Sequence, residues 1–179
     1  MKKIRNNKGF TLVELLAVIV VLAIVMGLAV VGITSVLDNT RKSAFASDAK
    51  SFIQGARSLV NSDQANALLG DATTYAPSCV TGGTVYLPIE LIPLEQGGKS
   101  PYGVAYSKGT ATAKQTSAPS GSYVAVVATV TNGACEIKYG IYLTDTVKEL
   151  KGTTTANTLV GKALKEDNIS AELVNNKSA

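Results

Sequence analysis

Histidine and tryptophan are absent from the 179 residues, and cysteine occurs only twice, as Cys79 and Cys135. Histidine is the side chain that most often acts as a general base near neutral pH, and neither cysteine has a metal-binding partner nearby in the sequence. We therefore expect no bound metal and no cofactor. The composition argues against an enzyme.

Nucleotide binding is also not expected. Gly98-Lys99-Ser100 is similar to the last residues of a phosphate-binding loop, whose leading glycine would have to be residue 93. That position is Pro93, and Pro101 follows the serine at once. These residues are interpreted as part of an ordinary turn.

Positive charge is concentrated at the N-terminus. The chain has 17 Lys and Arg residues against 13 Asp and Glu, a balance that would usually favour nucleic acid or anionic lipid as a partner. However, Lys2, Lys3, Arg5 and Lys8 all precede Phe10, so a chain starting at Phe10 would have 13 charges of each sign. We predict no direct nucleic-acid partner.

An uncharged apolar segment runs from Leu15 to Ile33. As a helix it is long enough to cross the hydrocarbon core of a bilayer. A secretory signal peptide is the alternative, but its apolar region is shorter and ends in small residues, whereas this one ends in Ser35-Val36-Leu37-Asp38. The preceding basic residues predict a single-pass protein of the cytoplasmic membrane, with its N-terminus in the cytoplasm and its C-terminal part exported.

Between the basic residues and this segment lies Lys8-Gly9-Phe10-Thr11-Leu12-Val13-Glu14. Together with both flanks, it resembles the N-terminus of type IV prepilins over about the first thirty residues. The resemblance implies that prepilin peptidase removes the leader, residues 1–9, by cutting between Gly9 and Phe10, and that Phe10 is then methylated. It also implies a subunit that forms a pilus at the cell surface with other pilins, an assembly platform and an ATPase.

Glu14 is a carboxylate at the edge of an apolar membrane helix, where a charge is costly and marks a functional position by default. Cleavage would create an ammonium on Phe10, which the Glu14 of a neighbouring subunit could meet. Such a pair would set the axial register between subunits, and the resemblance implies the same role. The alternative is that Glu14 only lies at the headgroup boundary.

Gly27 and Gly32 lie within the apolar segment. They indicate either close helix packing through small residues or local melting of the helix during assembly. Many pilins have a proline near this point, whereas this chain has Val31. Both interpretations, close packing and local melting, remain open.

Helical spacing continues beyond the apolar segment. Apolar residues recur on one face from Ala44 to Val60, with polar residues between them. We predict one helix from Phe10 to about Val60. Residues 10–37 form its membrane or filament-core half, and residues 38–70 its amphipathic half.

Residues 71–179 are predicted to form an exported β-rich domain. The best strands run from Tyr123 to Val130 and from Glu136 to Leu143, and Asn132-Gly133 between them favours a type I′ hairpin turn. Thr84–Leu87 and Val104–Ser107 are further candidates. The predicted fold is α+β, with the long helix on an antiparallel sheet of about four strands; it is also the pilin fold.

Two small-residue segments, Ser107–Ser122 and Gly152–Asn157, are predicted to be exposed loops. The segment from Gly161 to Ala179 could be a short helix or a strand with a tail. Outside the cytoplasm we expect a disulfide between Cys79 and Cys135, although two buried free thiols are the alternative.

Three functions remain open from the sequence. The first is a pilin, and the second is a pseudopilin of a type II secretion or competence system. Lys99-Ser100-Pro101-Tyr102-Gly103 is similar to the Pro-aromatic-Gly turn that begins the sheet of secretion pseudopilins. The third is a membrane-anchored binding domain that never polymerises.

Overall fold

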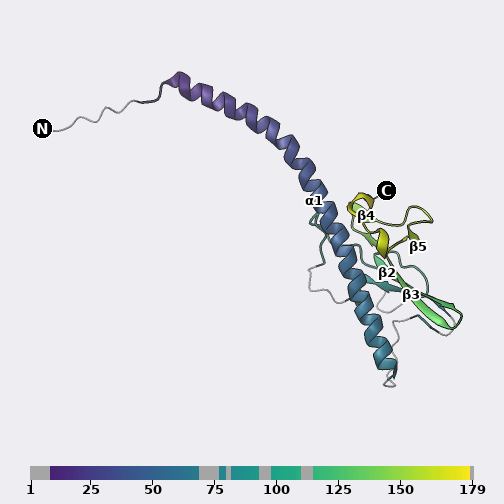
Figure 1. The fold of residues 1–179 in the computed structure, drawn as a ribbon. Coiled ribbons are helices and arrows are strands. Elements are labelled where there is room, and N and C mark those ends of the chain that lie inside the picture. Colours follow the sequence, from purple (N-terminus) through teal and green to yellow (C-terminus); the bar gives the residue numbers. More distant parts are fainter. Residues whose placement is uncertain (1–8, 69–76, 80–81, 93–97, 110–114, 178–179) are drawn as a thin grey trace. The chain divides into compact units, whose positions relative to one another are not determined.

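The structure, a computed structural model, describes residues 9–68, 77–79, 82–92, 98–109 and 115–177. The chain divides into two compact units, residues 1–40 and 41–179. A single helix, α1 (Leu12–Leu68), begins in the first unit and ends in the second (Figure 1). The two units are described separately.

The first unit consists of the apolar part of α1. Its side chains are exposed on every side, and its most apolar 18-residue window has a mean hydropathy of 3.1. By length and composition the helix can cross a membrane. The hydroxyl groups of Ser35 and Thr40 donate hydrogen bonds to the backbone carbonyls of Gly32 and Val36, so the helix itself provides their partners.

In the second unit, α1 buries one face. Phe45, Phe52, Ile53 and Val60 are at most 6% exposed and belong to the main hydrophobic core. α1 ends at Leu68, beyond the end near Val60 that the apolar periodicity predicted and close to residue 70, the predicted bound of the amphipathic half. The helix continues past the last apolar residues of that face because no glycine or proline occurs between Val60 and Gly70.

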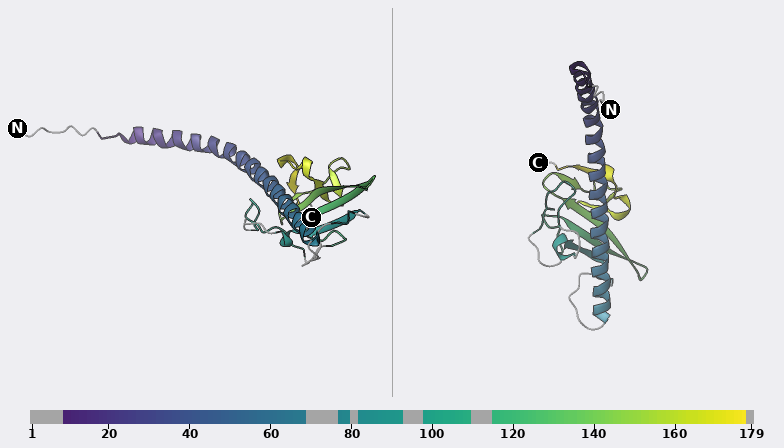
Figure 2. Two further views of the ribbon diagram at one scale, coloured as in Figure 1. Left: turned by 60° about the horizontal axis from the view of Figure 1, so that its bottom comes forward. Right: turned by 90° about the vertical axis from the view of Figure 1, so that its left-hand side faces the viewer.

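An antiparallel sheet forms the rest of the second unit (Figures 1 and 2). Its main path has the order β1-β2-β3-β4-β7, while β6 pairs with β3 and β5 pairs with β6. The strands are β1 (Gly83–Pro88), β2 (Tyr123–Thr131), β3 (Ala134–Thr144), β4 (Lys148–Leu150), β5 (Thr158–Val160), β6 (Ala163–Lys165) and β7 (Val174–Asn176). The predicted α+β fold is confirmed, although the described residues form a sheet of seven strands instead of about four.

The central hairpin follows the prediction closely. Thr131 pairs with Ala134 around the two-residue turn, and Asn132 and Gly133 have φ angles of 52° and 79°. Positive φ at both central positions is the type I′ geometry, which matches the twist of the two strands.

The predicted strand at Val104–Ser107 was wrong. Of its residues, only Ala105 lies in a β-bridge, an isolated one with Lys99. The Ser100 N–H donates to the Val104 carbonyl at 2.7 Å, and Gly103 has a φ of +81°. The chain makes a tight turn there, and the two segments that flank the turn are joined by too few backbone hydrogen bonds to form a strand.

The loop predicted from Ser107 to Ser122 is held at both ends. The Ser107 N–H donates to the Thr144 carbonyl at 2.7 Å, and the buried Ser122 hydroxyl exchanges two hydrogen bonds with the Thr144 backbone. Gln115 exchanges two backbone hydrogen bonds with Tyr86, while residues 110–114 lie outside the described part. Among the described residues of this segment, Lys108, residues 116–118 and Ser120 are exposed, as predicted, whereas Gly121 and Ser122 are buried.

The open question about the segment after Gly161 is settled in favour of short strands. It forms β6, the 3-10 turns η2 (Glu166–Asn168) and η3 (Ala171–Leu173), and then β7. Residues 153–156 are exposed, as predicted, and residues 178–179 lie outside the described part.

The sheet is covered on both faces. The main core lies against α1, and a smaller one on the opposite face contains the rings of Tyr86, Tyr123 and Tyr142. Packing between β3 and β6 is close at Gly140, where a Cβ atom would lie 2.9 Å from the backbone oxygen of Leu164. Only glycine lets the two strands approach this closely.

Candidate functional site at the helix N-terminus

The predicted cleavage site lies outside α1. Gly9 and Phe10 are non-helical, and Phe10 is 85% exposed. Proteases act on extended, accessible backbone, because the peptide groups of a helix are already hydrogen-bonded to one another. The Gly9–Phe10 bond has the exposure that cleavage requires.

Thr11 and Glu14 form a reciprocal cap at the start of the helix. Oε2 of Glu14 accepts hydrogen bonds from the Thr11 N–H at 2.9 Å and from the Thr11 hydroxyl at 2.8 Å. In return, the Glu14 N–H donates to the Thr11 hydroxyl oxygen at 3.3 Å. This is a capping box, and it explains why α1 begins at Leu12 and not at Phe10 as predicted.

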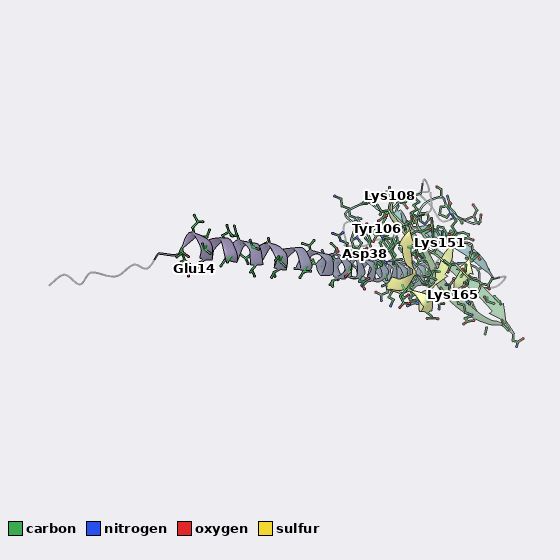
Figure 3. All side chains as sticks on the ribbon, turned by 90° about the horizontal axis from the view of Figure 1, so that it is seen from above. Glu14, Asp38, Tyr106, Lys108, Lys151 and Lys165 are labelled. Atoms are coloured by element: carbon green, nitrogen blue, oxygen red, sulfur yellow. A yellow bond between two sulfur atoms is a disulfide. The ribbon has the colours of Figure 1, made fainter. Side chains whose placement is uncertain are left out.

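The sequence interpretation assigned Glu14 only an intermolecular partner. The signal for the intrachain cap was present, because Thr-x-x-Glu before an apolar run is the sequence pattern of a capping box. Figure 3 shows Glu14 at the first turn of the helix.

Gly27 and Gly32 do not interrupt α1, which is helical at both positions. A Cβ atom at either glycine would meet nothing within 4 Å. Gly32 lies in a shallow apolar depression of about 270 Å³, together with Ala29, Ile33, Val36 and Leu37. The depression is compatible with close approach of another helix, since small residues let helix backbones come together.

The structure joins Cys79 and Cys135 by a disulfide, with their Cα atoms 5.4 Å apart. It connects the residues just before β1 to the exposed beginning of β3. The cross-link restricts the part of the hairpin that extends beyond the pairing with β1.

In the second unit, Tyr106 connects the 98–107 segment to α1. Its hydroxyl donates a hydrogen bond of 2.5 Å to Oδ2 of Asp48, and its ring packs edge-on against Phe45 and Phe52 at centroid distances of 5.5 and 5.7 Å. Burial, together with the neighbouring Asp48 carboxylate, raises the pKa of Tyr106 far above its usual range. Tyr106 therefore remains a neutral donor.

A second link joins α1 to the late part of the chain. Arg57 forms an ion pair of 2.6 Å with Glu166 and lies over the ring of Tyr139, 4.9 Å from its centroid. These residues line a surface pocket of about 390 Å³. The lining has three cationic side chains and three carboxylates, so the pocket offers no field of one sign to a charged ligand.

Within the described ranges, no group of three or more His, Cys, Asp or Glu side chains could hold a metal ion. Asp145, which is fully buried, instead organises the turn after β3, where its Oδ1 accepts hydrogen bonds from the N–H groups of Val147 and Lys148. This carboxylate therefore has a structural role.

Comparison with known proteins identifies the N-terminal segment. The family model described as "Prokaryotic N-terminal methylation motif" matches residues 4–30, a range that contains Gly9, Phe10 and Glu14. This motif is the signature of type IV prepilins and pseudopilins. No curated protein and no solved structure matches the chain.

Proposed function

From the prokaryotic N-terminal methylation motif we propose that this chain is the precursor of a type IV pilin, a structural subunit without catalytic activity. One observation carries the proposal. The motif combines an exposed Gly9–Phe10 bond, a capped Glu14 and a helix of membrane-spanning length, in that order.

The proposed sequence of events begins in the cytoplasmic membrane. The apolar half of α1 anchors the precursor there, with the leader in the cytoplasm and the second unit outside. Prepilin peptidase hydrolyses the Gly9–Phe10 bond, and the free amine of Phe10 is methylated. An assembly platform and an ATPase then move the subunit into a surface filament that serves adhesion, motility or DNA uptake.

The apolar helix supplies the physical reason to polymerise. Its large side chains, from Leu12 to Leu37, are 48–81% exposed in the single chain. Outside a bilayer this surface must be covered, and the same helix of other copies offers a matching apolar surface. Glu14 of one subunit would then pair with the Phe10 ammonium of a neighbour and fix their axial register.

A pseudopilin of a type II secretion or competence system is the second candidate. The turn at Ser100–Gly103 supports it, because the N–H groups of Ser100 and Gly103 close two consecutive backbone hydrogen bonds there. This segment is similar in sequence to the turn of secretion pseudopilins. Long filaments sheared from the cell surface and containing the chain would favour the pilin, and their absence would favour the pseudopilin.

The decisive experiment is mass spectrometry of the N-terminus of the chain from its native cells. We expect a chain that starts at N-methylated Phe10. Gly9→Ala is the matched variant, which should retain the leader. A wild-type chain that still starts at Met1 would overturn the proposal and leave an anchored domain that does not polymerise.

Glu14→Ala separates cleavage from assembly. The variant should be cut normally, because the scissile bond stays exposed, but it should yield few filaments or an unmethylated amine. Normal filaments carrying methylated Phe10 would contradict the role of Glu14 in pairing subunits.

A further inference from the structure

We propose that the second unit has a docking surface for the anionic phospholipid headgroups of the membrane in which α1 is anchored. This surface, called the basic patch below, consists of Arg41, Tyr102, Val147, Lys148 and Lys177. The inference goes beyond the proposed function but rests on one part of it, the anchoring of the apolar half of α1 in a bilayer.

The ring of Tyr102 brings two cations together. The guanidinium carbon of Arg41 lies 5.9 Å from the ring centroid, and Nζ of Lys148 lies 5.1 Å from it. Both are cation–π distances. The N–H of Tyr102 donates to the Ser100 hydroxyl at 3.2 Å, which holds the tyrosine in its turn. Charges from α1 and from β4 therefore meet at one aromatic side chain.

The other two residues of the basic patch adjoin Lys148. Val147 is 44% exposed, and among the described residues after Leu37 it is the one large apolar side chain that is exposed. Its carbonyl accepts a hydrogen bond of 2.9 Å from the N–H of Lys177, which is also exposed. Because Asp145 accepts hydrogen bonds of 2.6 Å from the N–H groups of both Val147 and Lys148, the turn has a fixed shape.

The exposed charge of this region is positive. Asp145 is fully buried, and Glu149 is 5% exposed and forms an ion pair with Lys151. Asp38 and Lys42 are one turn apart on α1, so their charges offset each other. The three cations of the basic patch therefore give a local positive excess, although a chain starting at Phe10 has equal numbers of both signs.

The connection to the apolar segment keeps the basic patch close to the bilayer. Arg41 follows Leu37, the last large apolar residue of the membrane-spanning half, by four positions. Four residues span at most about 15 Å even when fully extended, and this limit holds for any angle between the two units. Within the second unit, β4 lies at the end where α1 enters (Figure 1).

The basic patch combines features that bind proteins to anionic membranes. Each Lys or Arg near an anionic surface favours docking by about fivefold, because it attracts the lipid phosphates. An exposed apolar side chain such as Val147 can enter the boundary between headgroups and acyl chains. Tyrosine is typical of the same layer, since its ring is apolar and its hydroxyl group is polar. Docking would keep the second unit at the membrane until assembly removes the subunit.

The test measures docking in lipid nanodiscs that each contain one copy of the full chain. A fluorophore is attached to Thr146→Cys, an exposed position beside the basic patch, and a trace lipid with a nitroxide headgroup quenches it when the second unit is docked. The discs contain phosphatidylcholine alone, or equal parts of phosphatidylcholine and phosphatidylglycerol. We expect the ratio of docked to undocked chain to be about 100-fold higher in the anionic discs, from three cations at about fivefold each.

Two triple variants make the comparison. The first combines Arg41→Gln, Lys148→Gln and Lys177→Gln, and it should lose most of the response to phosphatidylglycerol. The control has glutamine at three other exposed lysines, Lys50, Lys138 and Lys162, and therefore the same net charge. The control should dock like the wild type. Tyrosine circular dichroism in the near ultraviolet verifies that both variants are folded.

Equal docking of the wild type in the two kinds of disc would overturn the proposal, and this result does not depend on any variant at the basic patch. Equal losses in the two triple variants would overturn it as well. If the first variant docks like the wild type but no longer forms filaments, the surface contacts another subunit and not lipid, which also refutes the proposal.

Failure of this inference can be told apart from failure of the proposed function. The nanodisc measurement needs neither prepilin peptidase nor assembly. A chain that does not enter the discs would refute the membrane anchor, and with it both the proposed function and the basic patch. A chain that enters the discs but does not respond to phosphatidylglycerol refutes only the basic patch, even if native filaments form normally.

Discussion

Replacing Tyr106 by phenylalanine isolates the hydrogen bond that joins the 98–107 segment to α1. The substitution removes one hydroxyl group and keeps the ring, so the edge-on contacts with Phe45 and Phe52 persist. The lost bond ends on the Asp48 carboxylate, and hydrogen bonds to charged groups contribute about 1.5–3 kcal/mol net. Because Asp48 is half-buried, we expect a loss at the lower end of this range.

The assay is guanidinium unfolding of the full chain in non-ionic detergent micelles. The chain has seven tyrosines and no tryptophan, so tyrosine circular dichroism in the near ultraviolet follows the packing of the second unit. We expect Tyr106→Phe to lower the free energy of unfolding by about 1.5 kcal/mol with an unchanged denaturant slope.

Asp48→Asn and the double variant complete a thermodynamic cycle. If the two side chains stabilise the fold through their mutual bond, the second substitution should cost much less in the presence of the first. A loss below about 0.5 kcal/mol for Tyr106→Phe, or two losses that simply add, would refute the hydrogen-bond argument.

Three further predictions concern the second unit. Reducing the disulfide should lower the free energy of unfolding of this unit by about 4 kcal/mol, as expected for a loop of about 57 residues. Peptide mapping of the native protein should show Cys79 linked to Cys135. Free thiols at these two positions would contradict the structure. Gly140→Ala should lower the free energy of unfolding by about 1–3 kcal/mol, because the added Cβ has no space. The control Gly98→Ala should be neutral, because a Cβ there would meet nothing within 4 Å. Equal effects of the two variants would contradict the close approach of the strands at Gly140. Burial raises the pKa of Tyr123 to about 12, above its value in the unfolded chain. The stabilisation by neutral, buried Tyr123 is therefore complete below about pH 10 and is lost as the pH rises toward 12. A denaturation midpoint that stays constant over that pH range would contradict the burial of Tyr123.

Two parts of the molecule could be predicted because their signals are local. The apolar run from Leu15 to Ile33 is long enough as a helix to span a bilayer, and Asn132-Gly133 selects one turn type through its positive φ angles. Such features are decided by neighbours in the sequence. The capping box at Thr11 and Glu14 also has a local signal, the Thr-x-x-Glu pattern. The sequence analysis did not predict it and gave Glu14 only a partner in another chain.

The rest of the sheet depends on distant partners. β4, β6 and β7 have three residues each, too few for an alternating pattern to show. Val104–Ser107 has strand-forming residues, but only Ala105 finds a β-bridge partner, Lys99. Tertiary contacts therefore decide these segments, and local propensity does not.

The Arg57–Glu166 ion pair bears on how the second unit folds. Its two residues are 109 positions apart. The pairing of β3 with β6 also requires residues near the end of the chain, Leu164 and Lys165. Domains built on such distant contacts fold slowly, because the chain must close long loops before those contacts form. Until Leu164, Ile169 and Val174 are in place, the main hydrophobic core lacks three of its buried residues. In the proposed export of this unit, that interval is when the chain is most exposed to aggregation and proteolysis.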